Sequence, residues 1–269
     1  MRAVTPSLIS IPNKNVTMRV TPHIVQTELE MCCVLSHLLA IYTAVYDDKL
    51  DPTNPYALIV EDDVNFEMDV DFAAMADKAP EGFGILQLMT SSSHDVDRLW
   101  KVYNETRKQW TRRHWETGYW STQAYLINKR VVKKFIDQVV VPYPGWSGNT
   151  NTDLPHFKIV TPSQKFWACS DTGPACYVPF RIVADIYLYT GCGPTYVSHL
   201  PFFNGAITNS TIHHKHFKTH RESFLEIGKV LEDVRQNATI LPPFVKPLPE
   251  RCIKIRKPED VEIKSEDGK

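Results

Sequence analysis

Apolar and polar residues alternate in blocks along the chain, and the apolar blocks predict helices and strands. The longest apolar block, Cys32 to Val45, follows Thr27 and Glu30, which have the spacing of a capping box at a helix N-terminus. We therefore expect a helix from Thr27 to about Tyr46. Polar side chains interrupt the block before it reaches the roughly 18 apolar residues of a membrane span, so it predicts a buried helix and no membrane span.

Shorter apolar blocks predict strands that alternate with helices. Their composition and flanking residues indicate strands at Tyr56–Val60, Gly82–Met89 and Trp120–Ile127, and helices at Asp69–Asp77 and Lys129–Val139. This alternation predicts an α/β fold with a mostly parallel sheet flanked by helices. Ligands of such sheets bind at the carboxyl ends of the strands.

Other segments have no clear period. Residues 1–27 and Pro142–Pro155 are rich in Pro or other turn residues and are expected to be loops with at most short extended pieces. The polar stretch Ser91–Thr117 is expected to be a long mobile excursion. Ile182–Tyr189 is a further apolar run, and residues 241–269 form a Pro- and Lys-rich tail that we expect to be partly disordered.

An acidic triplet is the most informative feature. The apolar run Ala57–Val60 ends in three consecutive carboxylates, Glu61, Asp62 and Asp63. Strand geometry places Glu61 and Asp63 on one face and Asp62 on the other. Three carboxylates at the end of a buried strand repel one another unless a cation lies between them, and Mn²⁺ or Mg²⁺ with a phosphate-bearing substrate fits that need. The alternative is that the acids cap the next helix or solvate a turn.

Composition narrows the classes of function. The 269 residues carry a formal net charge of −1, so the charge balance indicates no general affinity for nucleic acid. The chain has no CxxC pair, which argues against a zinc site. One disulfide among Cys169, Cys176 and Cys192 is left open.

N-glycosylation sequons in the sequence indicate the cellular compartment of the protein. Four N-x-S/T sequons, more than chance predicts, occur at Asn15, Asn104, Asn209 and Asn237. They favour the lumen of the secretory pathway (ER or Golgi) for a eukaryotic chain, with the cytoplasm as the expectation otherwise. Because the first residues do not form a signal peptide, a lumenal location implies an incomplete N-terminus.

Several segments, in order, resemble glycosyltransferase family 25, which includes lipopolysaccharide galactosyltransferases and procollagen galactosyltransferases. Glu30–His37 is similar to the family's E-x-G-C-x-x-S-H helix, and Ile59–Val64 to its L-E-D-D-V motif. Ser121–Ile127 is similar to its G-T-x-A-Y-L-I strand, and Ala184–Leu188 to its P-V-D segment, with Tyr196–Pro201 similar to the stretch that follows. Together the matches span about residues 28 to 205.

The chain departs from the family pattern. Cys32 stands where the family usually has Gly, and the family's opening strand, I-N-L-x-x-R-x-x-R, is not recognisable before residue 28. The chain is therefore expected to be an N-terminally incomplete enzyme, a divergent one or an inactive relative.

The resemblance implies a GT-A-like nucleotide-diphospho-sugar transferase fold. It implies one catalytic domain at residues 1–240, with a donor half at about 1–90 and an acceptor half at about 91–240, followed by the tail. It also implies a UDP-sugar donor (commonly UDP-galactose), Mn²⁺ or Mg²⁺, inversion at the anomeric carbon, and a carbohydrate or glycoprotein acceptor.

The chemistry of sugar transfer from a nucleotide assigns a role to each acid of the triplet. A metal that bridges two phosphates offsets the charge on the departing nucleotide. We assign Asp63 as the direct metal ligand and Glu61 as a ligand through water or a contact to the ribose. Asp62 joins the substrate-binding candidates if the turn reorients it, and is structural otherwise.

The resemblance adds further donor-site candidates. Ser36, His37 and Gln123 are assigned to donor binding, and His213 (or His214) to the metal shell. The alternatives are that His37 is a hydrogen-bonded core residue and that the histidines near residue 213 form a solvated polar turn.

Inversion needs a general base for the acceptor hydroxyl. Asp185 is the first candidate, because burial within an apolar run raises a carboxyl pKa. Its alternatives are an N-cap and an ion pair. Asp153 is the second candidate, with a turn aspartate as its alternative. Trp115 and Trp120 are expected to stack on a sugar ring or to be core residues.

Three functions compete at this point. The first is a metal-dependent inverting glycosyltransferase that moves a sugar, galactose by the resemblance, from a UDP-sugar to a glycan or glycoprotein. The second is a catalytically silent relative that acts as a lectin-like binding or scaffold module. The third is a metal-dependent phosphate hydrolase, which would need no acceptor sugar.

Overall fold

The computed structural model describes residues 7–10, 17–20, 28–47, 49–113, 119–141, 156–158, 183–205 and 217–247. The helices are α1 (Glu28–Tyr46), α2 (Phe72–Asp77), α3 (Ser93–Thr106), α4 (Lys129–Val139), α5 (Ala184–Gly191) and α6 (Phe217–Gln236), with a 3₁₀ turn at Ala238–Ile240. The strands are β1 (Ser7–Ser10), β2 (Thr17–Val20), β3 (Tyr56–Val60), β4 (Val64–Phe66), β5 (Met68–Val70), β6 (Ile85–Gln87), β7 (Trp110–Arg112), β8 (Ala124–Asn128), β9 (Val140–Val141), β10 (His156–Lys158), β11 (Thr195–Ser198), β12 (Phe203–Gly205) and β13 (Val245–Pro247).

The central sheet has five strands in the order β3-β8-β6-β11-β7. Only β6 and β11 pair in parallel, and the other three pairs are antiparallel. The expectation of an α/β fold is confirmed, but the expectation of a mostly parallel sheet is wrong. The alternation of strands and helices in the sequence does not specify the direction in which β8 enters, and β8 enters antiparallel to both neighbours.

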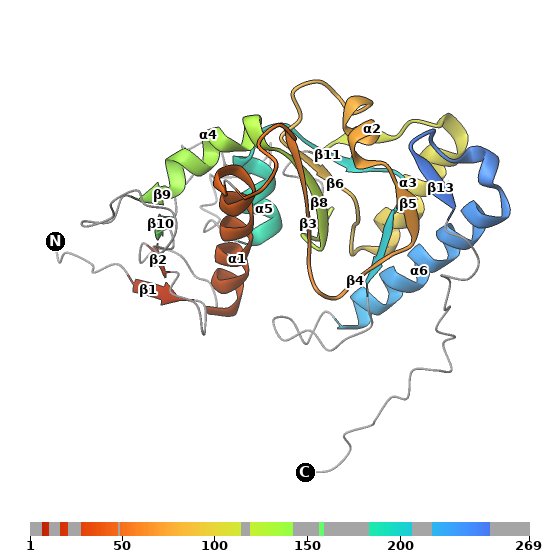
Figure 1. The fold of residues 1–269 in the computed structure, drawn as a ribbon. Helices are drawn as coiled ribbons and strands as arrows, with labels where there is room; N and C mark the ends of the chain where they lie inside the picture. Colours follow the sequence, from red (N-terminus) through yellow and green to blue (C-terminus); the bar gives the residue numbers. More distant parts are fainter. Residues whose placement is uncertain are drawn as a thin grey trace, which may run out of the picture.

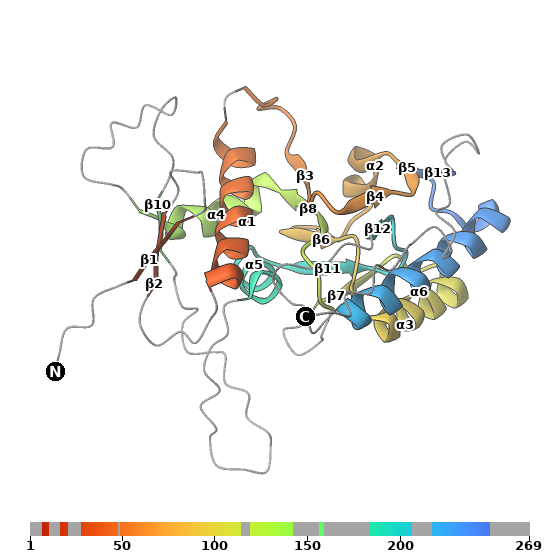
Figure 2. The same cartoon turned by 90° about the horizontal axis from the view of Figure 1, so that it is seen from below.

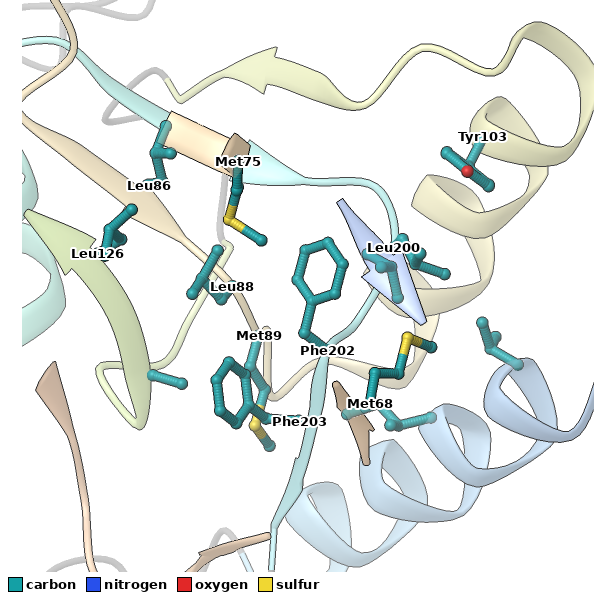
Figure 3. Packing of buried hydrophobic residues seen from close by; sticks show 14 of the residues in the cluster. Met68, Met75, Leu86, Leu88, Met89, Tyr103, Leu126, Leu200, Phe202 and Phe203 are labelled. Atoms are coloured by element: carbon teal, nitrogen blue, oxygen red, sulfur yellow. The ribbon is translucent and has the colours of Figure 1, made fainter. Parts of the chain in front are cut away.

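Helices cover both faces of this sheet. Neighbouring residues on each strand face opposite sides, so Ile85 and Ile127 lie in one apolar cluster while Leu86 and Leu126 lie in the other. The first cluster packs against α1, α4 and α5, and the second against α2, α3 and α6 (Figure 1). Viewed after a quarter turn, α3 and α6 lie side by side on their face (Figure 2), and Figure 3 shows the packing of the second cluster around Phe202 and Leu88.

Helix α1 confirms the helix predicted from the longest apolar block. Its Leu29–Tyr46 stretch is long and apolar enough to cross a membrane by length and composition, a property that core helices share. Its buried residues face the first cluster, which accounts for its apolar character. They include Met31, Val34, Leu35, Leu38 and Ile41.

The expectation of a mobile excursion at Ser91–Thr117 is wrong for most of that stretch. Residues 93–106 form α3, capped by Ser92, whose hydroxyl accepts a hydrogen bond from the Asp95 N–H. Val96, Leu99 and Tyr103 are buried, and their spacing places them on one face of the helix. The many charged residues on the other face hid this period, and residues 110–112 add the edge strand β7.

Several boundaries agree with the sequence, and others shift. Strand β3 and helix α4 have the predicted bounds. Helix α2 begins at Phe72, three residues later than predicted, because residues 68–70 form β5 and pair with β13 at the start of the predicted tail. Helix α6 had not been predicted. The predicted loop Pro142–Pro155 lies outside the described residues.

Candidate active site

The acidic triplet forms the turn between β3 and β4. Val60 ends β3, and the Glu61 N–H donates to the backbone carbonyl of Gln123 at 2.8 Å. Asp62 is exposed, whereas Glu61 and Asp63 are partly buried. The turn therefore lies at the sheet edge where β3 ends and β8 begins, as the sequence predicted for the end of a strand.

Glu61 is bonded from two elements. Its Oε1 atom accepts a 2.7 Å hydrogen bond from the Thr122 hydroxyl and lies 3.2 Å from Nε2 of His37. The other ring nitrogen of His37, Nδ1, lies 2.9 Å from the hydroxyl of Tyr125, which is fully buried on β8. His37 thus joins α1 to the acidic turn, and it is also buried and hydrogen-bonded, as the alternative of a hydrogen-bonded core residue expects.

Opposing effects set the pKa of Glu61. Burial would raise the pKa of its carboxyl. The hydrogen bond and charge of His37, the bond from Thr122 and the charge of His220 on α6 outweigh burial and leave the pKa below its ordinary value. The arrangement keeps Glu61 ionised at neutral pH.

Asp63 has the opposite balance. Its Oδ1 atom accepts a 3.2 Å hydrogen bond from the Gln123 amide, which favours ionisation. Burial and the charges of Glu61 and Asp62 outweigh that bond and raise the Asp63 pKa. Within the described ranges Asp63 forms no ion pair, so its charge is repelled by its neighbours and balanced by no basic side chain in contact.

The residues before β8, Trp120 to Gln123, form what we name the 120–123 segment. The Trp120 carbonyl accepts hydrogen bonds from the Thr90 hydroxyl (3.1 Å) and from the N–H (2.8 Å) and hydroxyl (3.2 Å) of Ser91. The Trp120 residue is 46% exposed, so the core alternative is wrong for it. Ser121 has a positive φ of 134°, a conformation that a non-glycine residue rarely adopts.

Asp185 lies in the first turn of α5 and is buried. Its Oδ1 atom accepts from the Ile186 N–H at 2.9 Å, and Oδ2 accepts from the Ser121 N–H at 3.4 Å. Burial raises its pKa, against the lowering effect of Arg113 and of these N–H donors. The N-cap of α5 is Val183, so the N-cap alternative for Asp185 is wrong.

Arg113 supplies a positive charge near Asp185. Its Nη2 atom donates to the Tyr119 carbonyl at 3.3 Å, and its guanidinium carbon lies 4.8 Å from the ring centroid of Tyr189. Burial lowers the Arg113 pKa, while Asp185 and Tyr189 oppose that shift. In the part of the chain that the structure describes, Arg113 and Asp185 form no direct ion pair, so the ion-pair alternative is not met.

The remaining predicted residues are dispersed. Ser36 is exposed on α1 beside His37, while Asp153, His213 and Trp115 lie outside the described residues. No group of three or more His, Cys, Asp or Glu side chains that could hold a metal occurs among the residues described.

The disulfide left open by the sequence is not made through Cys192. Cys192 is a buried free thiol, and burial raises its pKa. Cys169 and Cys176 lie outside the described residues.

Four residues at this site had no predicted role. Ser121, Thr122 and Tyr125 lie inside the Ser121–Ile127 motif, which was used only as a family signal and could have indicated them. Tyr189 lies on α5, and its hydroxyl donates a 2.6 Å hydrogen bond to the Ser121 carbonyl. Nothing in the local sequence indicates that contact, because the two residues are 68 positions apart.

Comparison with known proteins bears on this site. Residues 19–144 match the family model of glycosyltransferase family 25, described as an LPS biosynthesis protein. No curated protein and no solved structure matches the chain at a significant level. The matched span contains α1, the acidic turn and the 120–123 segment and ends before α5. The family resemblance is thereby confirmed over these residues, and it implies glycosyltransferase activity.

Proposed function

From the match of residues 19–144 to glycosyltransferase family 25, we propose that the chain is a metal-dependent inverting glycosyltransferase. In this proposal it transfers a sugar, galactose as the first choice, from a UDP-sugar to a glycan or glycoprotein acceptor. One observation carries it. Ser121, Thr122 and Gln123, three consecutive residues, each donate a hydrogen bond to a different carboxylate, in order Asp185, Glu61 and Asp63.

The carboxylates suit Mn²⁺ or Mg²⁺. Asp63 lies among like charges with a raised pKa and no ion pair among the described residues, so a cation would relieve the repulsion. These ions are commonly bound by one or two carboxylates together with substrate phosphates and water, so a closed group of three protein ligands is not required. Asp63 would hold the ion directly and Glu61 through water. A bound ion would offset the negative charge that gathers on the leaving UDP.

The neighbouring side chains orient these acids. The Gln123 amide directs Oδ1 of Asp63, while His37 and Thr122 fix Oε1 of Glu61. Because His37 and Thr122 stabilise the ionised form, Glu61 accepts hydrogen bonds at neutral pH. Its role in the proposal is therefore to accept a bond from a metal-bound water or from a ribose hydroxyl of the donor.

Asp185 is the proposed general base. A raised pKa brings a carboxylate closer to the operating pH, where proton abstraction is most effective. In the proposal one Asp185 oxygen accepts the proton of the acceptor hydroxyl. The oxygen of that hydroxyl attacks the anomeric carbon, and the bond between this carbon and UDP breaks. Asp153 is kept as the second candidate.

The test is titration calorimetry of UDP and UDP-galactose with and without Mn²⁺. Wild type is compared with Asp63→Ala and with Asp62→Ala, whose exposed carboxylate provides a matched control on the same turn. We expect Mn²⁺-dependent binding that Asp63→Ala loses and Asp62→Ala keeps. UDP binding that does not depend on Mn²⁺, or that is unchanged in Asp63→Ala, contradicts the assigned metal site.

An acceptor screen then separates the transferase from its alternatives. Transfer of labelled galactose to a glycan supports the proposal. UDP-sugar binding without transfer to any acceptor indicates the silent relative, and metal-dependent phosphate release without an acceptor indicates the hydrolase. The sequon-based proposal of a secretory lumen is tested separately by glycosidase sensitivity of the protein expressed in eukaryotic cells.

A further inference from the structure

Ser121 has an unusual backbone conformation. Among the described residues only Arg107 and Ser121 have positive φ without being glycine. Arg107, at φ 58°, ends α3 in the left-handed cap conformation that commonly terminates helices. Ser121, at φ 134°, ends no helix, and a non-glycine residue persists in such a conformation only when its surroundings enforce it.

Two side chains of α5 form hydrogen bonds with the backbone N–H and the backbone carbonyl of Ser121. The Asp185 carboxylate accepts from its N–H at 3.4 Å, and the Tyr189 hydroxyl donates to its carbonyl at 2.6 Å. Asp185 and Tyr189 are four residues apart and therefore project from the same face of the helix. These two bonds fix the peptide units before and after Ser121.

The Tyr189 ring is itself fixed. It is buried, with only 3% of the residue exposed. It packs edge-on against Tyr125 at 5.8 Å between centroids, and the Arg113 guanidinium lies 4.8 Å from its centroid. A ring packed in this way presents its hydroxyl at a constant position, so the bond to Ser121 is a rigid constraint.

The conformation of Ser121 determines where the next two side chains point. Its hydroxyl accepts from the Gln123 N–H at 3.1 Å, which closes a local turn. Thr122 then bonds Glu61 at 2.7 Å and Gln123 bonds Asp63 at 3.2 Å. Rotation of φ at Ser121 into its ordinary range would redirect both side chains away from the two carboxylates.

We propose that Tyr189 is a positioning residue of the active site. Through its hydroxyl it keeps Ser121 in the strained conformation that sets Thr122 against Glu61 and Gln123 against Asp63. The inference rests on the proposed function in one respect, the role of Glu61 and Asp63 in binding the metal and the donor. Its structural part, the coupling between Tyr189 and the Ser121 backbone, does not depend on that function.

The experiment uses Tyr189→Phe, Ser121→Gly and the double variant. Phe keeps the packed ring and removes only the hydroxyl, while Gly adopts positive φ at no steric cost. Tyr103→Phe is the control, because it removes a hydroxyl-to-carbonyl bond to Ile240 outside this site. The readouts are the affinity for UDP with Mn²⁺ and the free energy of unfolding in urea.

We expect Tyr189→Phe to weaken UDP binding about fivefold, the equivalent of one hydrogen bond, and Tyr103→Phe to leave it unchanged. In the Ser121→Gly background, which itself loses the hydrogen bond from the Gln123 N–H to the Ser121 hydroxyl, Tyr189→Phe should change UDP affinity less than about twofold, because Gly no longer needs the constraint. A Tyr189 with a merely structural role would weaken UDP binding equally in both backgrounds. Equal UDP affinity in Tyr189→Phe and wild type overturns the proposal.

The urea data distinguish failure of this inference from failure of the proposed function. If wild type binds no UDP, the proposed function fails and the double-mutant cycle still decides the inference. Coupling between the effects of Tyr189→Phe and Ser121→Gly on unfolding supports the constraint. Additive effects overturn it.

Discussion

The imidazole of His37 and the carboxylate of Glu61 lie 3.2 Å apart, which joins α1 to the end of β3. The contact lies inside the span that matches glycosyltransferase family 25. It helps to lower the Glu61 pKa, whereas the Asp63 pKa is raised. This difference between Glu61 and Asp63 gives the two acids opposite effects on stability.

Glu61→Gln is expected to destabilise the fold in a pH-dependent manner. A lowered folded-state pKa means that the ionised carboxylate adds stability above the ordinary pKa of Glu, and that this stability is lost as the pH falls through the folded-state pKa. We expect a loss of about 1.5–3 kcal/mol at pH 7, the range of hydrogen bonds to charged groups, that disappears in acid. Urea denaturation at several pH values measures it.

The control is Glu105→Gln, which neutralises an exposed acid on α3. It should change stability little at any pH. A loss in Glu61→Gln that stays constant from neutral to acid pH would contradict the assignment, because a packing defect has no titration.

Asp63→Asn should stabilise the metal-free protein. The raised pKa of Asp63 means that its ionised form costs stability once the pH rises through the folded-state pKa. Asn removes the charge and keeps an oxygen that accepts from Gln123. We expect a gain of about 0.2–1 kcal/mol at pH 7, the range for partly exposed charges.

The same variant should lose its response to metal. Addition of MnCl₂ should raise the melting temperature of wild type and of Asp62→Asn, and leave that of Asp63→Asn unchanged. The melting curves with and without Mn²⁺ test both halves of the prediction. An Asp63→Asn protein that is still stabilised by Mn²⁺ would place the cation elsewhere.

The sequence predicted the parts of the site that are local. Strand β3, helix α1 and the acidic turn follow from short patterns in neighbouring residues. Strand alternation predicted that Glu61 and Asp62 face different sides, and their burial differs as expected although both lie in a turn. Contacts across the fold do not. Ser121 meets Asp185 64 positions away and Tyr189 68 positions away, and only the packing of α5 brings them together.

One position in the sequence could have indicated the strain. The family pattern compared with Ser121–Ile127 has glycine where this chain has Ser121. The positive φ of Ser121 gives that glycine a physical reason. Charge masked other signals. The buried residues of α3 are separated by charged ones, so the segment was interpreted as a loop.

Trp120 is expected to contact the acceptor sugar. The residue is 46% exposed beside the three carboxylate-binding residues, and its carbonyl is fixed by bonds from Thr90 and Ser91 that do not involve the side chain. Trp120→Leu should therefore keep the segment in place and lose only the aromatic face. We expect a cost of about 1 kcal/mol in acceptor binding, seen as a several-fold higher acceptor KM with unchanged UDP affinity.

The matched control for Trp120→Leu is Trp100→Leu on α3, a partly buried Trp that packs against Tyr103. It should lower stability without a specific change in the acceptor KM. Equal acceptor KM values for wild type and Trp120→Leu would exclude the indole from the acceptor site.

Gly84 and Gly228 are expected to respond to alanine in opposite directions. At Gly84 an added Cβ would lie 1.8 Å from the backbone carbonyl oxygen of Cys192. The backbone there cannot yield easily, because the Gly84 N–H donates to Pro194 at 2.7 Å and its carbonyl accepts from Asn128 at 2.9 Å. We expect Gly84→Ala to cost at least about 2 kcal/mol, as overpacking of a fixed backbone does.

Gly228 lies inside α6, and an added Cβ would meet no atom within 4 Å apart from its chain neighbours and the nearby backbone of its own helix. Gly228→Ala should therefore stabilise the fold by roughly 0.5–1 kcal/mol, since alanine loses less backbone entropy than glycine in a helix. Urea denaturation of both variants measures the pair. A tolerated Gly84→Ala would mean that β6 and the residues after α5 approach less closely than the structure shows. That result would weaken the placement of α5 against the 120–123 segment, on which the role of Tyr189 depends.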